Sequence, residues 1–534
     1  MSFLDRLSIL DRFTTRDPAP VARFWLWFAA ILVAGTIARF WNLGGAPIWM
    51  DEAVTLGFAR LDLWTLLTKN VDNHPPLTWV IQHIWHAINP DPDHARVPAA
   101  TFGAMSVAAI LLAMRDTAGG RAALFTGALF AFATAHVHYS QDARMYPFLI
   151  FGLILAAWGG LGHVRPNLHG PRTYAALYVI GGAIAIYSHI LGLVVMALIG
   201  FASLVAGGLT QDRTQFAKDW FIRNIILFVI TLPWLIQIPS AAGTFPGIAG
   251  DNSLTDIQWF FRNATGFPGL PGWGILLETV YFGLAGLSIL IALRHGRIGM
   301  AAMLTGLIAL FPIFVLALHI SNPIMANKTL LAGIIGVTMG AGYALSRLKP
   351  AIASIVIAGV LSAGAFTSMA NELTHRVKME DYAGAFAHAA NAGLGDAPVV
   401  TCVHFHAAAA WENRREGRIL YYRRGDVLDY KGPDYWRAAS RSMSWLRAAD
   451  ADEINAALGG DWLIEGGLEA ALEGETAALF IRPNCPVGRE DEILAGLQSI
   501  GFTATDTTRI MGAYGGSLIL EEPLTRITLL QRAD

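Results

Sequence analysis

The sequence predicts a polytopic α-helical membrane protein of about 11 transmembrane helices, followed by a C-terminal extracytoplasmic α/β domain. Of its 534 residues, 54% are hydrophobic and only 15% are charged, and the mean hydropathy is +0.46. Charge is unevenly spread, because residues 1–370 hold 22 basic and 16 acidic side chains, whereas residues 371–534 hold 16 basic and 24 acidic ones. This pattern excludes a single water-soluble globule and a disordered chain.

Eleven apolar segments are of the length that crosses a bilayer, which takes roughly 20 residues. We predict them at 21–43, 96–114, 122–138, 146–161, 173–188, 190–208, 221–237, 272–293, 299–319, 329–346 and 351–369. Ten or twelve spans also fit the pattern. Lys and Arg favour cytoplasmic loops, and here they gather in alternate loops. This alternation predicts a cytoplasmic N-terminal segment, 1–20, and an odd number of spans then places the tail, 371–534, in the periplasm.

The predicted membrane domain, 21–370, contains a long outer loop at 44–95. Two amphipathic stretches in this loop, 61–67 and 76–88, are typical of helices that lie at the membrane interface. In the tail we predict helices and strands in the mixed order of a small α/β domain. The helices are at 382–392, 451–458 and 490–500, and the strands at 397–405, 476–482 and 516–520.

The chain has two cysteines, Cys402 and Cys485, too few for a disulfide scaffold or a zinc ribbon. In an oxidising periplasm they could pair, but their spacing leaves this open. The tail has no nucleotide-binding glycine loop. A net charge of −2 gives no reason to expect nucleic-acid binding.

Two polar segments of the long outer loop could carry chemistry. Asp51 and Glu52 follow Trp49-Met50 just beyond the first span, where carboxylates beside a membrane are costly and usually functional. His74 precedes a Pro-Pro pair that fixes the backbone and starts a helix. The alternative interpretation of Asp51 and Glu52 is a solvated loop charge, and that of the Pro-Pro pair after His74 is a helix start without a function in chemistry.

A third polar segment, 138–146, lies at the outer end of the third span. It sets the acid Asp142 and the base Arg144 between the phenols Tyr139 and Tyr146, where hydrocarbon is expected. A surface pair of Arg144 with Asp142, with the arginine snorkelling to the interface, is the alternative interpretation.

Together these segments resemble the GT-C glycosyltransferases of family 39 and their bacterial relatives, which include protein O-mannosyltransferases, lipid A aminoarabinose transferases and Rgt-type galacturonosyltransferases. The resemblance covers about residues 20–350. Its motifs are Trp49-Met50-Asp51-Glu52, Asp72-Asn73-His74-Pro75-Pro76-Leu77, Arg96-Val97-Pro98 and Tyr139-Ser140-Gln141-Asp142-Ala143-Arg144-Met145-Tyr146, with weaker matches at Tyr187-Ser188-His189, Leu232-Pro233-Trp234 and Ala326-Asn327-Lys328-Thr329-Leu330. It implies a GT-C fold in the bacterial inner membrane. It also implies inverting transfer of a sugar from a polyprenyl-phosphate donor to an envelope lipid, glycan or protein.

The resemblance also implies roles for single residues. Asp51 matches the family's catalytic carboxylate and suits a general base, which typically contributes about 10²–10⁴-fold. Arg144 matches a position near the donor phosphate, which its planar fork can bind in bidentate fashion. The other candidate residues at the donor site are His74, Tyr139, Asp142, Tyr146 and Lys328, with Glu52 orienting the site. A divalent cation held by Asp51 and Asp142 stays an alternative.

The sequence departs from these relatives at three points, so it selects no sugar and no acceptor. His74 stands where the aminoarabinose transferases tend to have Lys, Lys328 stands where many relatives have Arg-Tyr, and no loop can hold the β-trefoil of the protein mannosyltransferases. Two other functions stay open. A transporter or lipid flippase often shows inverted repeats and broken helices near the midplane, whereas here no repeat is evident and the polar segments lie at the outer ends of spans. A structural partner in an envelope assembly would need none of the motifs.

Overall fold

The structure is a computed structural model that describes residues 7–532, except 17, 19, 70, 72–73, 166, 211–212, 239–253, 269, 271–272, 322–326, 375–379, 415–416, 424, 433, 437–450, 483–484, 486–487 and 511–524. Internal contacts divide the chain into two compact units. The helical unit comprises Met1–Trp41 and Arg96–Thr374, and the mixed unit comprises Asn42–Ala95, His375–Gly515 and Ile519–Asp534.

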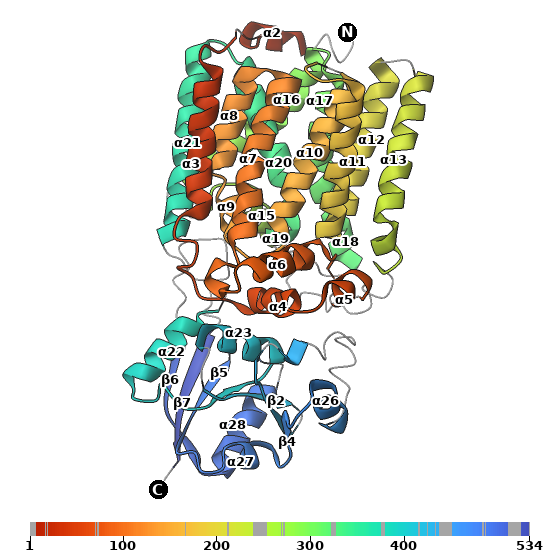
Figure 1. Ribbon diagram of the computed structural model, residues 1–534. Coiled ribbons are helices and arrows are strands. Elements are labelled where there is room, and N and C mark those ends of the chain that lie inside the picture. Colours follow the sequence, from red (N-terminus) through yellow and green to blue (C-terminus); the bar gives the residue numbers. More distant parts are fainter. Residues whose placement is uncertain are drawn as a thin grey trace. The chain divides into compact units, whose positions relative to one another are not determined.

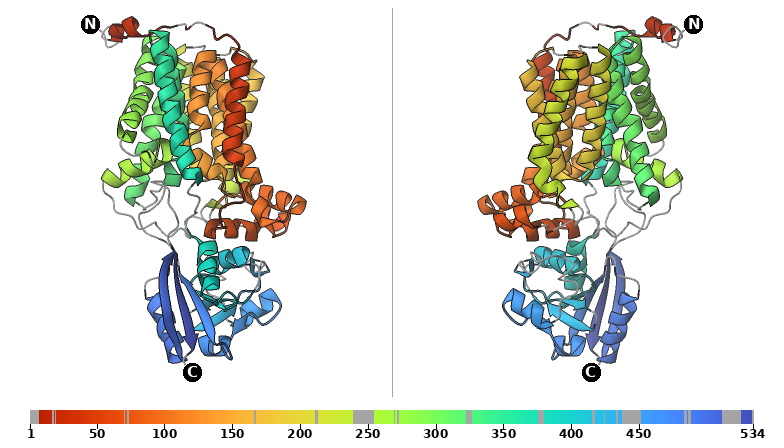
Figure 2. Two further views of the ribbon diagram at one scale, coloured as in Figure 1. Left: turned by 90° about the vertical axis from the view of Figure 1, so that its left-hand side faces the viewer. Right: turned by 90° about the vertical axis from the view of Figure 1, so that its right-hand side faces the viewer.

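The long helices of the helical unit lie side by side as one bundle (Figure 1), as the two turned views also show (Figure 2). They are α3 (Phe24–Phe40), α7 (Val97–Ala118), α8 (Gly120–Ala131), α10 (Tyr146–Val164), α11 (Pro171–Ser188), α12 (Leu191–Thr210), α13 (Arg213–Leu235), α16 (Gly274–Arg294), α20 (Gly333–Arg347) and α21 (Ala351–Thr374). Shorter helices join them: η1 (Leu7–Ile9), α2 (Leu10–Phe13), α9 (Thr134–Ser140), α15 (Leu254–Thr265), α17 (Ile298–Leu304), the π-helical η3 (Thr305–Leu310), α18 (Phe311–Ser321) and α19 (Asn327–Leu330). Helices close their own backbone hydrogen bonds, as a bilayer requires.

All eleven predicted spans fall on helices of this unit. Among the described residues, six helices are long and apolar enough to cross a membrane, and Phe24–Phe40 and Gly120–Ala131 are apolar but shorter. The six are Pro92–Ala118, Tyr146–Val164, Leu191–Leu209, Gly274–Arg294, Ile298–Ile320 and Ala351–Thr374. The protein is therefore a polytopic membrane protein, as predicted, while the number of eleven spans stays a prediction.

The predicted span 122–138 is broken in the structure. Helix α8 ends at Ala131, and α9 begins at Thr134. The buried guanidinium of Arg39, on α3, donates to the carbonyl oxygens of Ala131 at 3.0 Å and Phe130 at 3.3 Å. A helix end leaves such carbonyls without intrahelical partners, so Arg39 stabilises the break.

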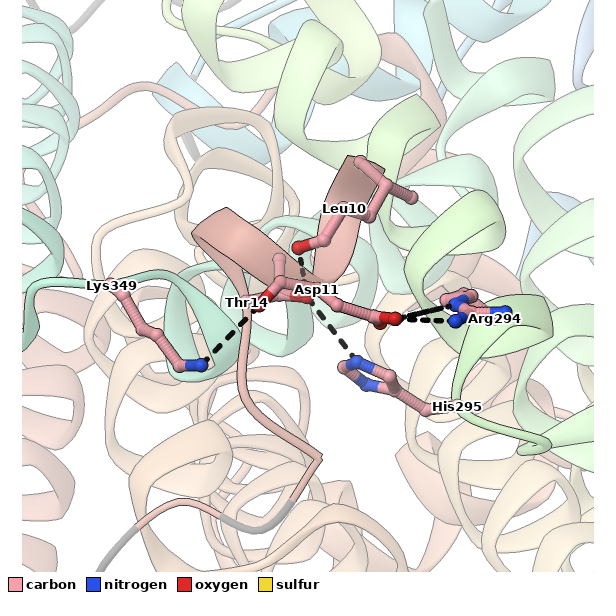
Figure 3. Close-up of polar contacts among 6 residues, drawn as sticks. All are labelled: Leu10, Asp11, Thr14, Arg294, His295 and Lys349. Atoms are coloured by element: carbon pink, nitrogen blue, oxygen red, sulfur yellow. Dashed lines mark hydrogen bonds and ion pairs between the residues drawn. The ribbon is translucent and has the colours of Figure 1, made fainter. Parts of the chain in front are cut away.

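The N-terminal helix α2 joins two turns of the bundle (Figure 3). Nε of Arg294, at the end of α16, donates to Asp11 at 3.1 Å, and Nε2 of His295 lies 3.2 Å from Oγ1 of Thr14. The backbone N–H of Lys349, between α20 and α21, donates to the carbonyl of Phe13 at 2.7 Å. The N-terminal segment is therefore part of the fold.

The mixed unit contains a seven-stranded sheet of order β4-β3-β2-β1-β5-β7-β6, in which β1 is parallel to β2 and β5 and the other pairs are antiparallel. The strands are β1 (Val399–Thr401), β2 (Ile419–Arg423), β3 (Asp426–Asp429), β4 (Leu463–Ile464), β5 (Ala477–Arg482), β6 (Phe502–Ile510) and β7 (Thr525–Arg532). Helices α27 (Gly467–Ala471) and α28 (Arg489–Ser499) share an apolar core with one face of the sheet. Helices α22 (Tyr382–Asn391) and α23 (His404–Arg414) pack against β7 and against β1 and β2 (Figure 1), and α26 (Ala451–Leu458) lies by β4.

The structure confirms the predicted helices 382–392, 451–458 and 490–500 and the strand 476–482. The predicted strand 397–405 is wrong beyond Thr401, because the chain turns into α23 at His404. Four successive alanines, Ala407–Ala410, follow there, and alanine has the highest helix propensity. The predicted strand 516–520 lies outside the described residues.

A disulfide joins Cys402, directly after β1, to Cys485, beyond β5. Cys402 belongs to the apolar core, and Cys485 packs against it. The pairing that the sequence left open is therefore present.

The segment 42–95 also belongs to the mixed unit. It forms α4 (Met50–Ala59), α5 (Leu63–Thr68), α6 (Leu77–Ile88) and the short 3₁₀ turn η2 (Pro92–His94). Helices α5 and α6 confirm the helical character predicted for 61–67 and 76–88. Three apolar side chains of α5, those of Leu63, Trp64 and Leu67, are exposed.

Candidate active site

Asp51 and Glu52 lie in the first turn of α4, a helix from Met50 to Ala59 that the sequence did not predict within the long outer loop. Carboxylates in a first turn interact favourably with the partial positive charge of a helix N-terminus. Glu52 is fully buried and Asp51 is partly exposed. Successive helical residues point about 100° apart, so only Asp51 offers its carboxylate to an outside group.

His74 lies in the same unit, directly before α6. The Pro-Pro pair precedes Leu77, the first residue of α6, as the sequence predicted, whereas Asp72 and Asn73 lie outside the described residues. The ring of His83, on α6, donates from Nδ1 to the carbonyl of Ala59 at 2.9 Å. Helix α6 is therefore joined to the C-terminal end of α4.

In the helical unit, the segment 139–146 runs from the end of α9 through a turn into α10, and all of it is buried except Tyr139, which is half-buried. Arg144 is only 3% exposed, and Asp142 is fully buried. The backbone N–H of Arg144 donates to the carbonyl of Asp142 at 2.7 Å, which makes the turn tight. The side-chain amide of Gln141 donates to the carbonyls of Ala38 at 2.9 Å and Trp41 at 3.2 Å. The C-terminal end of α3 thus fixes this turn.

Three rings follow one another beside the turn. The ring centroids of Tyr139 and Tyr146 are 4.7 Å apart, and those of Tyr146 and His189 are 6.0 Å apart. Such spacings are typical of favourable aromatic pairs. His189 lies in the turn between α11 and α12, outside both helices. The sequence pointed to it only through the weak match Tyr187-Ser188-His189.

Two cations act on His189. Burial lowers the pKa of its imidazole from 6.5 to about 3, and the positive charges of Lys328 and Arg144 lower that pKa further in the same direction. Lys328 comes from α19, far along the chain from the α9–α10 turn. The charges of Arg144 and Lys328 therefore both act on His189, and we call these three residues the cationic group. In it His189 is neutral at neutral pH and can act as a hydrogen-bond donor.

The predicted site residues fall into two sets. Asp142, Arg144, Tyr139, Tyr146 and Lys328 belong to the helical unit, while Asp51, Glu52 and His74 belong to the mixed unit. Within the parts of the chain that the structure describes, no three His, Cys, Asp or Glu side chains are grouped so that they could hold a metal ion.

Sequence reasoning missed several polar residues that hold these sets in place. Arg39 donates from Nη2 to Nδ1 of His136 at 2.7 Å, in addition to its carbonyl contacts. An arginine inside an apolar span is itself a signal, because such residues are rare and need partners. Gln141 stood inside a recognised motif without an assigned role.

No family model matches the sequence, and no curated protein matches it. Its fold is similar to solved structures. ArnT from Cupriavidus metallidurans in the apo state superposes with a TM-score of 0.60 and 12% identity, over 94% of this chain and 97% of that one. The same protein bound to undecaprenyl phosphate gives a TM-score of 0.54 and 13% identity, over 95% and 98% of the two chains. An oligosaccharyltransferase from Archaeoglobus fulgidus is less similar, with a TM-score of 0.48 and 11% identity, over 85% and 67%.

Proposed function

From the premise that this polytopic membrane protein has the fold of the GT-C glycosyltransferases, we propose that it is a membrane glycosyltransferase. It transfers a sugar from a polyprenyl-phosphate donor to an envelope lipid, glycan or protein, with inversion, at the periplasmic face of a bacterial inner membrane. The observation that carries the proposal is the cationic group of Arg144, Lys328 and His189, in which Arg144 and His189 are buried and Lys328 is partly buried. The undecaprenyl phosphate bound in a structurally similar protein gives independent support.

The cationic group suits the phosphate end of such a donor. A guanidinium presents two parallel N–H donors to phosphate oxygens, and an ammonium adds a second, compact charge. Positive charge held in place at a leaving phosphate is often the largest single term in catalysis. Arg144 and Lys328 would therefore stabilise the departing polyprenyl phosphate.

Asp51 suits the acceptor end of the reaction. In a single displacement the acceptor oxygen bonds to the anomeric carbon, the bond from that carbon to the phosphate oxygen breaks, and the phosphate leaves with the electron pair. The proton of the acceptor hydroxyl passes to the Asp51 carboxylate. The buried Glu52 would hold α4 in place, and His74, Asp142, Tyr139 and Tyr146 would contact the donor sugar or phosphate.

The test is release of undecaprenyl phosphate when the purified protein is incubated with candidate undecaprenyl-phosphate sugars and acceptor lipids. Asp51→Asn should lower turnover at least about 100-fold and leave the melting curve in detergent unchanged. Asp93→Asn, which changes an exposed carboxylate of the same segment, is the matched control. Turnover above a tenth of wild type in Asp51→Asn would contradict the role of a base.

Two alternatives give different results in the same assay. A flippase would move labelled lipid across vesicles without releasing sugar, and Asp51→Asn would not slow it. A reaction that needs a divalent cation at Asp51 and Asp142 would stop with EDTA and resume with added Mg²⁺ or Mn²⁺.

We also propose that the tail lies in the periplasm. The Cys402–Cys485 disulfide supports this location, because such bonds persist in oxidising compartments. A reporter that is active only in the periplasm, fused after Asp534, should be active. An active cytoplasmic reporter at the same point would contradict the proposed orientation.

A further inference from the structure

We propose that the tail acts as a clamp on α4 and that Asn413, Glu380 and Glu412 are positioning residues for Asp51. The inference rests on the proposed role of Asp51 as the base. All of the contacts lie within the mixed unit. They give the tail a role in the reaction that its small α/β fold does not by itself suggest.

Asn413, on α23, holds the backbone just before α4. Its side-chain Oδ1 accepts from the N–H of Ile48 at 3.0 Å, and its Nδ2 donates to the carbonyl of the same residue at 2.6 Å. A third hydrogen bond, from Nδ2 to the carbonyl of Ala409 at 2.8 Å, fixes the amide on its own helix. An amide side chain can both donate and accept, so Asn413 alone binds both the N–H and the carbonyl of Ile48, as a neighbouring strand would.

Glu380 supplies the cap that the sequence around α4 lacks. The first N–H groups of a helix have no intrahelical acceptor, and Trp49, at the N-cap position, makes no side-chain cap hydrogen bond. Oε2 of Glu380 accepts from the N–H of Met50 at 3.0 Å, across 330 residues of sequence. Glu380 is 1% exposed, so little water competes for this bond, and its negative charge complements the helix N-terminus.

The other end of α4 is held by charge and by close packing. Nη1 and Nη2 of Arg60 both donate to the carboxylate of Glu412, on α23. The ring of Phe58 lies 5.2 Å from that of Trp436. A Cβ added to Gly57 would lie 2.2 Å from Nε1 of Trp436, so only glycine allows the helix to approach this indole.

These contacts bear directly on Asp51, which follows Met50. A displacement of about 1 Å in a reacting group can lower a rate about 100-fold. Loss of the clamp should therefore lower the rate of transfer, whereas donor binding, which we assign to the cationic group, should change little.

The experiment compares Asn413→Ala and Glu380→Ala with Glu380→Gln, which keeps an acceptor oxygen, in the full-length protein. The matched control is Arg414→Ala, because Arg414 also lies on α23 but donates only to tail carbonyls, those of Ala397 and Gly395, in the contacts described. Hydrogen exchange of the amides in 47–60 and single-turnover transfer are measured side by side, with exchange of β5 as an internal reference for tail folding.

We expect exchange in 47–60 to become at least about tenfold faster in both alanine variants, because Asn413→Ala loses two hydrogen bonds to Ile48 and Glu380→Ala loses one to a carboxylate. Transfer should fall about 10- to 100-fold, with the donor KM changed less than about twofold and partial recovery in Glu380→Gln. Exchange of β5 should stay within about twofold of wild type in all variants. In Arg414→Ala, exchange in 47–60 and single-turnover transfer should also stay within about twofold of wild type.

Unchanged exchange in 47–60 would overturn the clamp whatever the activity. Faster exchange with wild-type transfer would overturn the positioning role. If the wild-type protein released no undecaprenyl phosphate from any donor, the proposed function would fail, while the exchange measurements would still decide whether the clamp exists.

Discussion

The two units hold their polar functional residues by different means. In the helical unit, Gln141 and Arg39 donate to main-chain carbonyls at helix ends. In the mixed unit, α4 is held by side chains of the tail, two of which, Glu380 and Glu412, are carboxylates. Inside a bilayer no water can satisfy a carbonyl that a helix end leaves open, so helix breaks are available as acceptors there. In the mixed unit, side chains of the tail bind the ends of α4 instead.

Because of this difference, we expect substitutions to affect the site residues of the helical unit and those of the mixed unit separately. The turn 139–146 depends on contacts between membrane helices, whereas α4 depends on the folding of the tail. A change in the tail should therefore affect α4 and leave the helical unit intact, and a change at the end of α3 should do the reverse. Four predictions follow this comparison, from the largest expected effect to the smallest.

Replacing both Cys402 and Cys485 by Ser should destabilise the tail by about 4 kcal/mol, because the disulfide closes a loop of 83 residues in the unfolded chain. Urea-dependent pulse proteolysis of the full-length protein measures this free energy of opening. Exchange in 47–60 should rise with it, while the melting of the helical unit stays constant. Reduction of the wild-type protein with dithiothreitol is the control and should reproduce the effect. Equal opening free energies with and without the disulfide would contradict the prediction.

Arg144→Lys should slow transfer or weaken donor binding about 10- to 150-fold, because losing one charge-assisted hydrogen bond costs roughly 1.5–3 kcal/mol although the charge is kept. Single-turnover transfer and donor binding measure it. Arg121→Lys, which changes an arginine in the first turn of α8, is the control and should have little effect. Near-normal transfer would remove Arg144 from the proposed site.

The tail should lose about 2 kcal/mol of stability between pH 7.5 and pH 5 through His406 alone. Burial lowers the pKa of this imidazole, on α23, from 6.5 to about 4. Between these values the unfolded chain takes up a proton that the folded chain does not, so stability falls as the pH falls through 6.5 and levels off near 4. Pulse proteolysis at the two pH values, in wild type and His406→Asn, isolates the contribution.

His406→Asn offers a polar atom near the position of Nδ1, which forms a 2.6 Å hydrogen bond with the hydroxyl of Tyr382. His388→Asn, which changes a half-buried histidine paired with Asp506, should keep the pH dependence at His406. The same pH dependence in wild type and His406→Asn would contradict the prediction.

Gln141→Ala should cost about 1–2 kcal/mol of stability in the helical unit, since two neutral hydrogen bonds to the end of α3 are lost. It should also disturb the 139–146 turn and so lower donor affinity, without faster exchange in 47–60. Melting in detergent and donor binding measure these effects. Thr101→Ala, which removes an exposed hydroxyl that bonds within its own helix, serves as the control, and faster exchange of α4 in Gln141→Ala would break the comparison.

The sequence predicts the helical unit better than the mixed unit, for a physical reason. A run of apolar residues is enough to predict a membrane helix, and motif residues such as Tyr139 and Arg144 cluster in one short turn. The break after α8 was missed because the guanidinium that stabilises it comes from α3, whose own sequence is an ordinary apolar span apart from Arg39.

In the mixed unit, the helix at Asp51 was missed because its cap, Glu380, lies 330 residues away. Strand β6 was missed because its pattern, Phe502 to Ile510, is mostly polar and exposed, as an edge strand permits. Strand β1 was predicted too long because an apolar run alone does not tell a buried strand from the start of a helix. The disulfide could not be deduced because spacing does not give geometry.

The capping of Met50 by Glu380 has a consequence for the timing of biosynthesis. At about 5–20 residues per second, the 330 residues between them take roughly 20 to 60 s to synthesise. During this interval α4 is complete in sequence and α6 can already contact its C-terminal end, but the tail side chains that bind Met50 and Arg60 are missing. A nascent chain cut short before Glu380 would thus contain every motif of the proposed site and still have its proposed base, Asp51, on a helix without its N-terminal cap, so activity should appear only after the tail has been made and folded.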